Sequence, residues 1–213
     1  MFKKLKEKLF GYGHHERICC GEYRVSQVLF LIDAVLINAA YVLTTGIFLS
    51  GFIISLEGSD FIVALLNNAA TWATILSVFS FLVLERIKKR KKFLIAINLI
   101  ARIFASGIVF IPLLLDSTGL TIIIVAVMVI ISHVLWGIYQ LGWMIWYMEI
   151  APEGKKNDYV YLRMFFVRIA FTVSTLVMGY ILDYYSKSYT GFLVVFITAL
   201  VLSIMDVIVL VFI

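Results

Sequence analysis

The stretch Glu85-Arg86-Ile87-Lys88-Lys89-Arg90-Lys91-Lys92 decides the fold, because six of its eight residues are basic and a long apolar segment lies on each side of it. A soluble core cannot enclose two such segments around a charge cluster. A bilayer can hold them, because about 20 apolar residues rising about 1.5 Å each cross the ~30 Å hydrocarbon layer. Cytoplasmic loops of membrane proteins carry an excess of Lys and Arg. We therefore expect residues 85–92 to form a short cytoplasmic loop between two membrane spans.

The composition of the 213-residue chain agrees with that reading. It is 63% hydrophobic and 15% charged, with a mean hydropathy of +1.05, whereas soluble domains have about 45–50% apolar and about 25% charged residues. Continuous apolar segments and only two prolines favour membrane helices over the alternating strands of a β-barrel. The net charge of +5 is concentrated near the amino terminus and in the 85–92 loop. We interpret it as contact with the lipid bilayer and predict no nucleic-acid binding.

The sequence predicts an all-α integral membrane protein with six transmembrane helices behind a basic tail, residues 1–24. The tail forms either a short amphipathic helix at the membrane surface or a disordered segment. The fourth span is longer than a bilayer requires, which predicts tilt or a projecting end. The expected spans are residues 25–49, 61–84, 93–115, 120–147, 159–182 and 191–213.

The distribution of basic residues predicts the orientation. The tail and the 85–92 loop hold six Lys and Arg residues each, and the loop 149–158 holds two more. Lys187 is the only basic residue in the loops on the opposite side. Both termini are therefore expected in the cytoplasm, with the protein in the plasma membrane.

Four charged residues fall inside the predicted spans and form one candidate charge network, namely Asp33, Arg102, Arg168 and Asp206. Each lies seven to nine residues from the cytoplasmic end of its span, which places all four at about 10–14 Å depth. A lone charge there costs at least about 2.5–3.5 kcal/mol on insertion scales, so two acids and two bases at one depth predict pairing. The sequence does not say which acid pairs with which base. Such a network couples transport to a proton or solute, or fixes helix register as static ion pairs.

The fourth span carries a polar and aromatic stripe, made of His133, Trp136, Gln140 and Trp143. Residues at three- and four-residue spacing share one face of a helix. Because buried His and Gln need polar partners or water, the stripe predicts a cavity for an organic solute or proton; ordinary helix packing is the alternative. Asn38 of the first span is a weaker candidate for the same cavity, since helix–helix hydrogen bonds also explain such residues.

No motif in the chain indicates an enzyme. The sequence has no G-x-S-x-G, H-E-x-x-H or phosphate-binding loop motif. Asp33 and Asp206 could form the aspartyl pair of an intramembrane enzyme, but neither lies in a recognisable catalytic motif. We therefore expect no enzymatic activity, no cofactor and no metal site.

The loop between the second and third predicted spans resembles that of the major facilitator superfamily of transporters, which reads roughly G-x-L-x-D-R-x-G-R-[RK]. Glu85 stands at the motif Asp, Arg86 at the Arg that follows it, and Arg90 at a later basic position, while both motif glycines are absent. Two further segments are similar to that family, namely Pro152-Glu153 followed by Arg163, and Gly179-Tyr180-Ile181-Leu182-Asp183. The likeness covers residues 25–213.

The resemblance implies that the chain is the amino-terminal six-helix half of such a transporter, built from two inverted three-helix repeats. It places the first and fourth spans around the cavity, so that Asp33 and His133 are the residues best placed for a solute or proton. It also implies a second six-helix half as partner, either another copy of this chain or a carboxy-terminal half.

Two functions are therefore open. The leading hypothesis is a secondary transporter that moves a small solute, of unknown identity, by alternating access. The alternative is a membrane accessory or interaction subunit that transports nothing. In that case the 85–92 loop would be the functional part of the chain.

Overall fold

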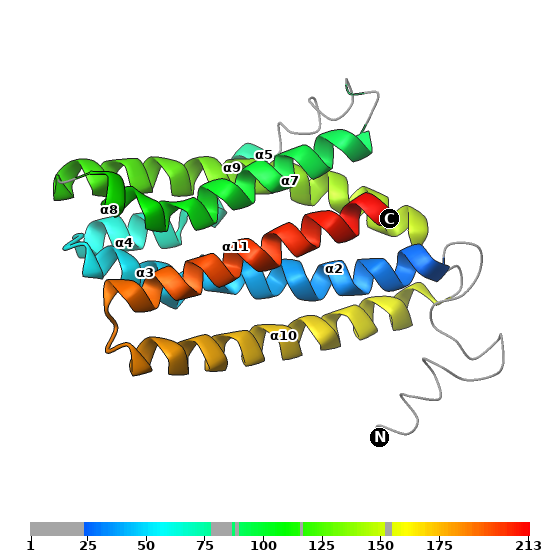
Figure 1. Cartoon of the computed structure of the whole chain (residues 1–213). Helices are drawn as coiled ribbons and strands as arrows, with labels where there is room; N and C mark the ends of the chain where they lie inside the picture. The colour runs from blue at the N-terminus through cyan, green and yellow to red at the C-terminus, as the bar shows by residue number, and fades with distance from the viewer. Residues whose placement is uncertain (1–23, 78–86, 88–89, 116, 152–154) are drawn as a thin grey trace.

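The computed structural model describes residues 24–77, 87, 90–115, 117–151 and 155–213, and these residues form helices and no strand (Figure 1). Residues 1–23 of the predicted tail and the motif residues Glu85 and Arg86 lie outside the described part. The helices are α2 (Arg24–Leu43), α3 (Gly46–Ser55), α4 (Asp60–Asn67), α5 (Ala69–Ser77), α7 (Arg90–Gly107), α8 (Ile111–Leu114), α9 (Thr118–Ile150), α10 (Lys156–Tyr184) and α11 (Tyr189–Phe212), with a 3₁₀ turn at Ile108–Phe110.

The expectation of a helical, multi-pass membrane protein is confirmed by the length and composition of the helices. Within the described residues, five helical segments are long and apolar enough to cross a membrane, and they are Arg24–Ser55, Arg90–Leu114, Thr118–Ile150, Lys156–Tyr184 and Tyr189–Phe212. The expected second span, residues 61–84, is described only to Ser77, and it consists of two short helices separated at Asn68. Residues 78–84 lie outside the described part, so this second span, and with it the total of six spans, stays a prediction.

The first span differs from its expected bounds, since it continues to Ser55 after an interruption between α2 and α3. The hydroxyl groups of Thr44 and Thr45 donate to the Tyr41 carbonyl oxygen at 3.2 and 2.8 Å. Such back-bonding bends helices. Gly46 then adopts φ +56°, a conformation in which L side chains are strained. Local backbone chemistry at these residues therefore ends α2 and restarts the span as α3.

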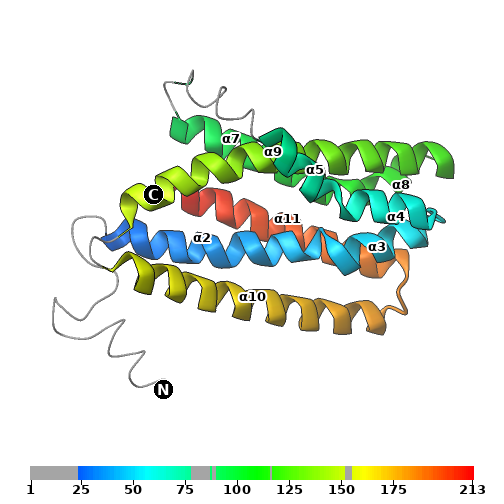
Figure 2. The same ribbon diagram turned by 180° about the vertical axis from the view of Figure 1, so that it is seen from behind.

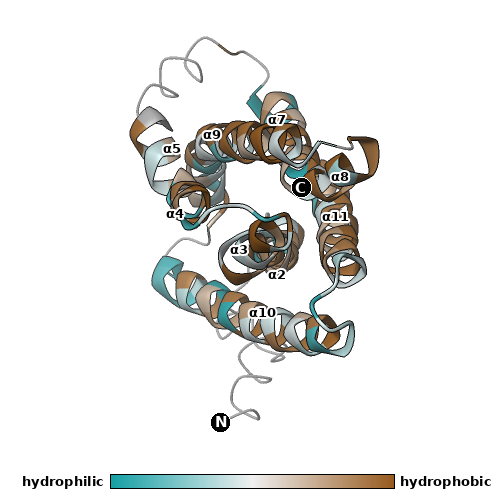
Figure 3. Ribbon diagram, turned by 90° about the vertical axis from the view of Figure 1, so that its left-hand side faces the viewer, coloured by the Kyte–Doolittle hydropathy of each residue, from teal (hydrophilic) through white to brown (hydrophobic). Residues whose placement is uncertain are grey.

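The segment α2–α3 lies at the centre of the bundle, as the view along the helices shows (Figure 3). α2 packs against α10 and α11, whereas α9 packs against α5 and α7. α7 and α11 also pack together and so join the two groups. Seen from behind (Figure 2), α10 forms one edge of the bundle and α2 separates it from α9. At 33 residues, α9 is about 50 Å long, which is the excess length that the sequence predicts.

Two clusters of buried apolar side chains lie toward opposite ends of the bundle. The proximal end is the end where α2 begins and α9 and α11 finish; the distal end is where α3 and α10 finish (Figure 1). The proximal cluster contains stacked aromatic rings, with Trp143 and Tyr147 centroids 5.0 Å apart and Tyr147 and Tyr159 centroids 5.4 Å apart. The distal cluster contains Phe52 and Phe196, with centroids 5.2 Å apart. Each cluster closes the bundle at its end.

Candidate functional site

A layer of buried polar side chains separates the two apolar clusters. On α11, Asp206 lies between Ala199 of the distal cluster and Leu210 of the proximal one. α7 and α9 have the same order of distal, polar and proximal residues. The polar layer comprises Asp33 on α2, Asn98, Arg102 and Ser106 on α7, Ser132 and His133 on α9, and Ser203 and Asp206 on α11.

Two carboxyl groups meet within this layer. Asp33 and Asp206 are both 0% exposed, and their side chains lie within hydrogen-bonding reach of each other. Trp143 Nε1 donates to Asp33 Oδ2 at 3.1 Å, and Asn98 Nδ2 donates to Asp206 Oδ2 at 2.9 Å. Among the described residues, none donates a hydrogen bond to the Oδ1 atom of either aspartate. A hydrogen bond between two carboxyl groups requires a proton on one of them.

Arg102 crosses the layer beside the two aspartates. Its side chain is 3% exposed, and its guanidinium lies 4.1 Å from the Trp136 ring centroid and 5.9 Å from that of Tyr41. Arg102 also interacts electrostatically with Asp206 and Asp33. Its Nε and Nη2 atoms are buried and have no hydrogen-bond partner within the described part of the chain. Aromatic stacking therefore holds the guanidinium plane while two of its nitrogens stay unpaired.

The second arginine near the aspartates is Arg163, and the prediction of Arg168 in the buried network is corrected here. Arg168 is exposed on α10. Arg163 is half-buried, lies 4.5 Å from the Trp143 ring centroid, and interacts electrostatically with Asp33. The two arginines are five residues apart, which is a rotation of about 140° around a helix. Because α10 packs with its Arg163 side toward α2, Arg168 points out of the bundle.

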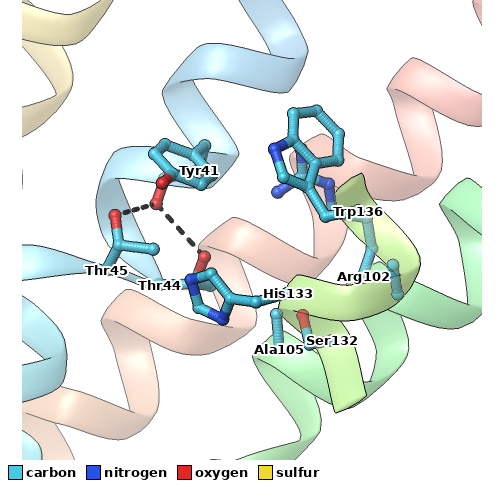
Figure 4. A pocket seen from close by; sticks show the side chains of 9 residues that line it. Tyr41, Thr44, Thr45, Arg102, Ala105, Ser132, His133 and Trp136 are labelled. Atoms are coloured by element: carbon cyan, nitrogen blue, oxygen red, sulfur yellow. Dashed lines mark hydrogen bonds between the residues drawn. The ribbon is translucent and has the colours of Figure 1, made fainter. Parts of the chain in front are cut away.

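A small cavity lies next to Arg102 (Figure 4). Its volume is about 10 Å³, which is room for about one water molecule. The Tyr41 carbonyl oxygen accepts the Thr44 and Thr45 hydroxyl groups along one side of it (Figure 4). Its lining is formed by Tyr41, Thr44, Thr45, Ala101, Arg102, Ala105, Ser132, His133 and Trp136. Polar groups from three helices thus converge where α2 is interrupted.

The predicted stripe on α9 is divided by the structure. His133 and Trp136 line the cavity, and Trp143 contacts Asp33. Gln140 is exposed and does not line this small cavity, so its place in a cavity between two halves stays a prediction; Tyr139, 1% exposed, lies on the inward face of α9. Because 3.6 residues complete a helical turn, the residues on the inward face recur at steps of either three or four.

The side chains of His133 and Asn38 form hydrogen bonds with backbone carbonyls of their own helices. His133 Nδ1 is 2.8 Å from the Val129 carbonyl oxygen, and Asn38 Nδ2 donates to the Ala34 carbonyl oxygen at 2.8 Å. Asn38 is half-buried and does not line the cavity.

Sequence reasoning missed Asn98, Tyr139 and the role of Arg163. Asn98 and Arg102 are four residues apart on α7, a spacing that puts both on one face, and this signal could have identified Asn98. The sequence identifies Arg163 only as part of a family-like segment, and nothing in the sequence shows that it lies near Asp33.

Of the predicted loop residues, Glu85 and Arg86 lie outside the described part, and Arg90 lies away from this layer. Arg90 begins α7 and is exposed, at the proximal end. No group of three or more metal-ligating side chains occurs among the described residues. Searches against known protein families, curated proteins and solved structures found no match to this chain.

Proposed function

We propose that this protein is a proton-coupled secondary transporter of the major facilitator type, with the polar layer as its solute and proton site. The observation that carries the proposal is the Asp33–Asp206 pair, buried between two apolar clusters. A buried carboxylate without enough hydrogen bonds is costly in a membrane. A proton shared by the pair lets one carboxyl group donate a hydrogen bond to the other.

The charged and titratable groups facing the pair suit reversible proton binding. Arg102 on α7 and Arg163 on α10 interact electrostatically with the carboxyl groups. Tyr139 on α9 also interacts electrostatically with both aspartates. With one shared proton the two acids and two arginines carry a net charge of +1, and without it they are neutral. Neither state leaves a large uncompensated charge in the bilayer, so both are accessible during a transport cycle.

The order of helix packing supports the comparison with inverted repeats. The expected spans are, in order, α2–α3, α4–α5, α7, α9, α10 and α11. The first packs against the fifth and sixth (α2 with α10 and α11), the fourth against the second and third (α9 with α5 and α7), and the third against the sixth (α7 with α11). Exchanging the first three spans with the last three, in order, converts this set of contacts into itself. Two inverted three-helix repeats would pack in that way.

The closed ends support alternating access. The proximal cluster covers the polar layer on one side and the distal cluster on the other. A transporter of this type opens one end at a time, and here the helices of this six-helix unit must themselves separate at that end as the unit moves against a second one. We propose that the second unit is another copy or a carboxy-terminal half, and that the proximal end faces the cytoplasm.

The test uses proteoliposomes that contain the full chain and an internal pH-sensitive dye. A panel of neutral, cationic and carboxylate-bearing solutes is added outside, and solute-dependent proton movement is recorded. We expect Asp33→Asn and Asp206→Asn each to reduce that movement at least about tenfold, because an amide cannot exchange the shared proton. An Asn also supplies both a donor and an acceptor, so the fold should survive.

Asp183→Asn is the matched control, because Asp183 is exposed at the end of α10 and should leave proton movement unchanged. Infrared spectra of the same samples should show a protonated carboxyl band that Asp33→Asn removes. Unchanged proton movement in both buried Asn variants would exclude the pair as the coupling site. Absence of any solute-dependent movement in the unmodified protein would favour the accessory-subunit alternative.

A further inference from the structure

We propose that the cavity beside Arg102 is a binding site for the carboxylate group of a small organic anion. The unpaired Nε and Nη2 atoms of Arg102 lie on the same edge of the guanidinium group. Their N–H bonds form the parallel fork that matches the two oxygens of a carboxylate. Two buried donors without acceptors are unfavourable, and a bidentate carboxylate satisfies both at once.

The other groups around the cavity suit the same ligand. Ser132 is 5% exposed and lines the cavity with its neighbour His133 from α9 (Figure 4). A serine hydroxyl can donate to a carboxylate oxygen. Trp136 and Tyr41 contribute aromatic surface on which the carbon portion of the solute can pack. Thr44 and Thr45 are less available, because their hydroxyl groups already donate to backbone carbonyls.

The charges select a monovalent anion over a phosphate dianion. Arg102 is the one cationic residue among those lining the cavity, and Asp206 and Asp33 interact with it from its other surroundings. A second negative charge on the ligand would face these acids without a second cation in the cavity. A single carboxylate matches the single guanidinium fork.

The size of the cavity indicates that solute entry requires opening of the bundle. At about 10 Å³ the cavity holds about one water molecule, so the structure represents a closed form. The interruption between α2 and α3 borders the cavity at Thr44 and Thr45, which places a break in the helix where the site must widen. Irregular backbone beside a central binding site is a recurrent feature of transporters.

The test measures thermal unfolding of the purified full chain in detergent during titration with sodium propionate. Propionamide serves as the neutral isostere, sodium chloride as the ionic-strength control and sodium phosphate as the competing anion. We expect saturable stabilisation by propionate alone. Arg102→Gln should weaken propionate binding roughly 10- to 100-fold, and Arg102→Lys about tenfold, because lysine keeps the charge and loses the fork.

Ser132→Ala guards against loss of folding in the Arg102 variants, and it should weaken binding about 3- to 10-fold. Arg168→Gln is the matched control, since that arginine is exposed on α10, and it should bind propionate normally. Equal stabilisation by propionamide, stronger stabilisation by phosphate, or full binding in Arg102→Lys would overturn the proposal. No stabilisation by propionate in a cooperatively folded sample would also overturn it.

The proposal that the bound anion is the transported solute rests on the proposed function, whereas the binding site itself does not. Propionate binding without solute-dependent proton movement would keep the anion site and remove the transporter. Proton movement driven only by neutral or cationic solutes, without propionate binding, would remove the anion site and keep the transporter.

Discussion

At the scale of single residues, the hydrogen bond from Trp143 to Asp33 is the contact that most directly positions the buried carboxyl pair. The indole is 8% exposed and its Nε1 donates to Asp33 Oδ2 at 3.1 Å. Tryptophan has one donor and no acceptor, so it satisfies one Asp33 oxygen, and Oδ1 has no donor among the described residues.

Trp143→Phe is expected to lower the free energy of unfolding by about 1–3 kcal/mol, because it leaves Asp33 Oδ2 without its donor while keeping an aromatic ring. Thermal or denaturant unfolding in detergent measures the change. Trp146→Phe is the matched control: Trp146 packs on Phe30 with centroids 5.2 Å apart and is half-buried. Equal losses in the two variants would show that ring size, and not the hydrogen bond, determines the effect.

At the scale of elements, the important feature is the interruption of the first span. Thr44, Thr45 and Gly46 replace a turn of regular helix beside the cavity. Lipid cannot hydrogen-bond the freed backbone groups, so irregular backbone at this depth must be buried in protein or line a polar cavity. Here Thr44 is 4% exposed, and its hydroxyl partly supplies the missing bonds.

Gly46→Ala is expected to destabilise the protein by about 1–2 kcal/mol, because a Cβ at positive φ is strained. No atom lies within 4 Å of that Cβ position, so crowding contributes nothing. Gly179→Ala on α10 has equal space and no positive φ, and it should stabilise by about 0.5–1 kcal/mol as an ordinary helix substitution. Unfolding midpoints in detergent check both signs. A neutral Gly46→Ala would mean that the α2–α3 junction is not strained.

At the scale of the whole molecule, two apolar clusters enclose a polar layer, and basic residues gather at the proximal end. Arg24, Lys91, Lys92 and Lys156 lie at that end, whereas the described distal loops contain Lys187. The asymmetry is the basis of the proposed orientation, because translocation of Lys and Arg is disfavoured.

Cysteine labelling tests that orientation in intact cells. In a Cys19→Ser, Cys20→Ser background, Ser188→Cys at the distal end should react with a membrane-impermeant maleimide. Asn157→Cys at the proximal end should react only after permeabilisation. Both positions are exposed and neither substitution changes the charge. The reverse labelling pattern would invert the proposed topology, and labelling of both sites in intact cells would indicate mixed insertion.

The sequence by itself determined the membrane character, the approximate bounds of most spans and the common depth of Asp33, Arg102 and Asp206. These features depend only on position along the chain. The bilayer is a uniform apolar solvent, so the length, hydropathy and charge of a segment determine whether and where it crosses. For the same reason the excess length of α9 was predictable. The interruption at Thr44–Gly46 was not, because a single glycine does not reveal its φ angle.

Only the tertiary structure decided which side chains meet. Arg163 replaces Arg168, and Tyr139 lies on the inward face of α9 while Gln140 is exposed, because each helix is rotated about its axis by packing against its neighbours. Lipid tails are as apolar as leucine, so hydropathy alone does not distinguish the buried face of a membrane helix from its lipid-facing face. The pairing of Asp33 with Asp206 and the unpaired fork of Arg102 are consequences of that rotation, and the functional proposals depend on them.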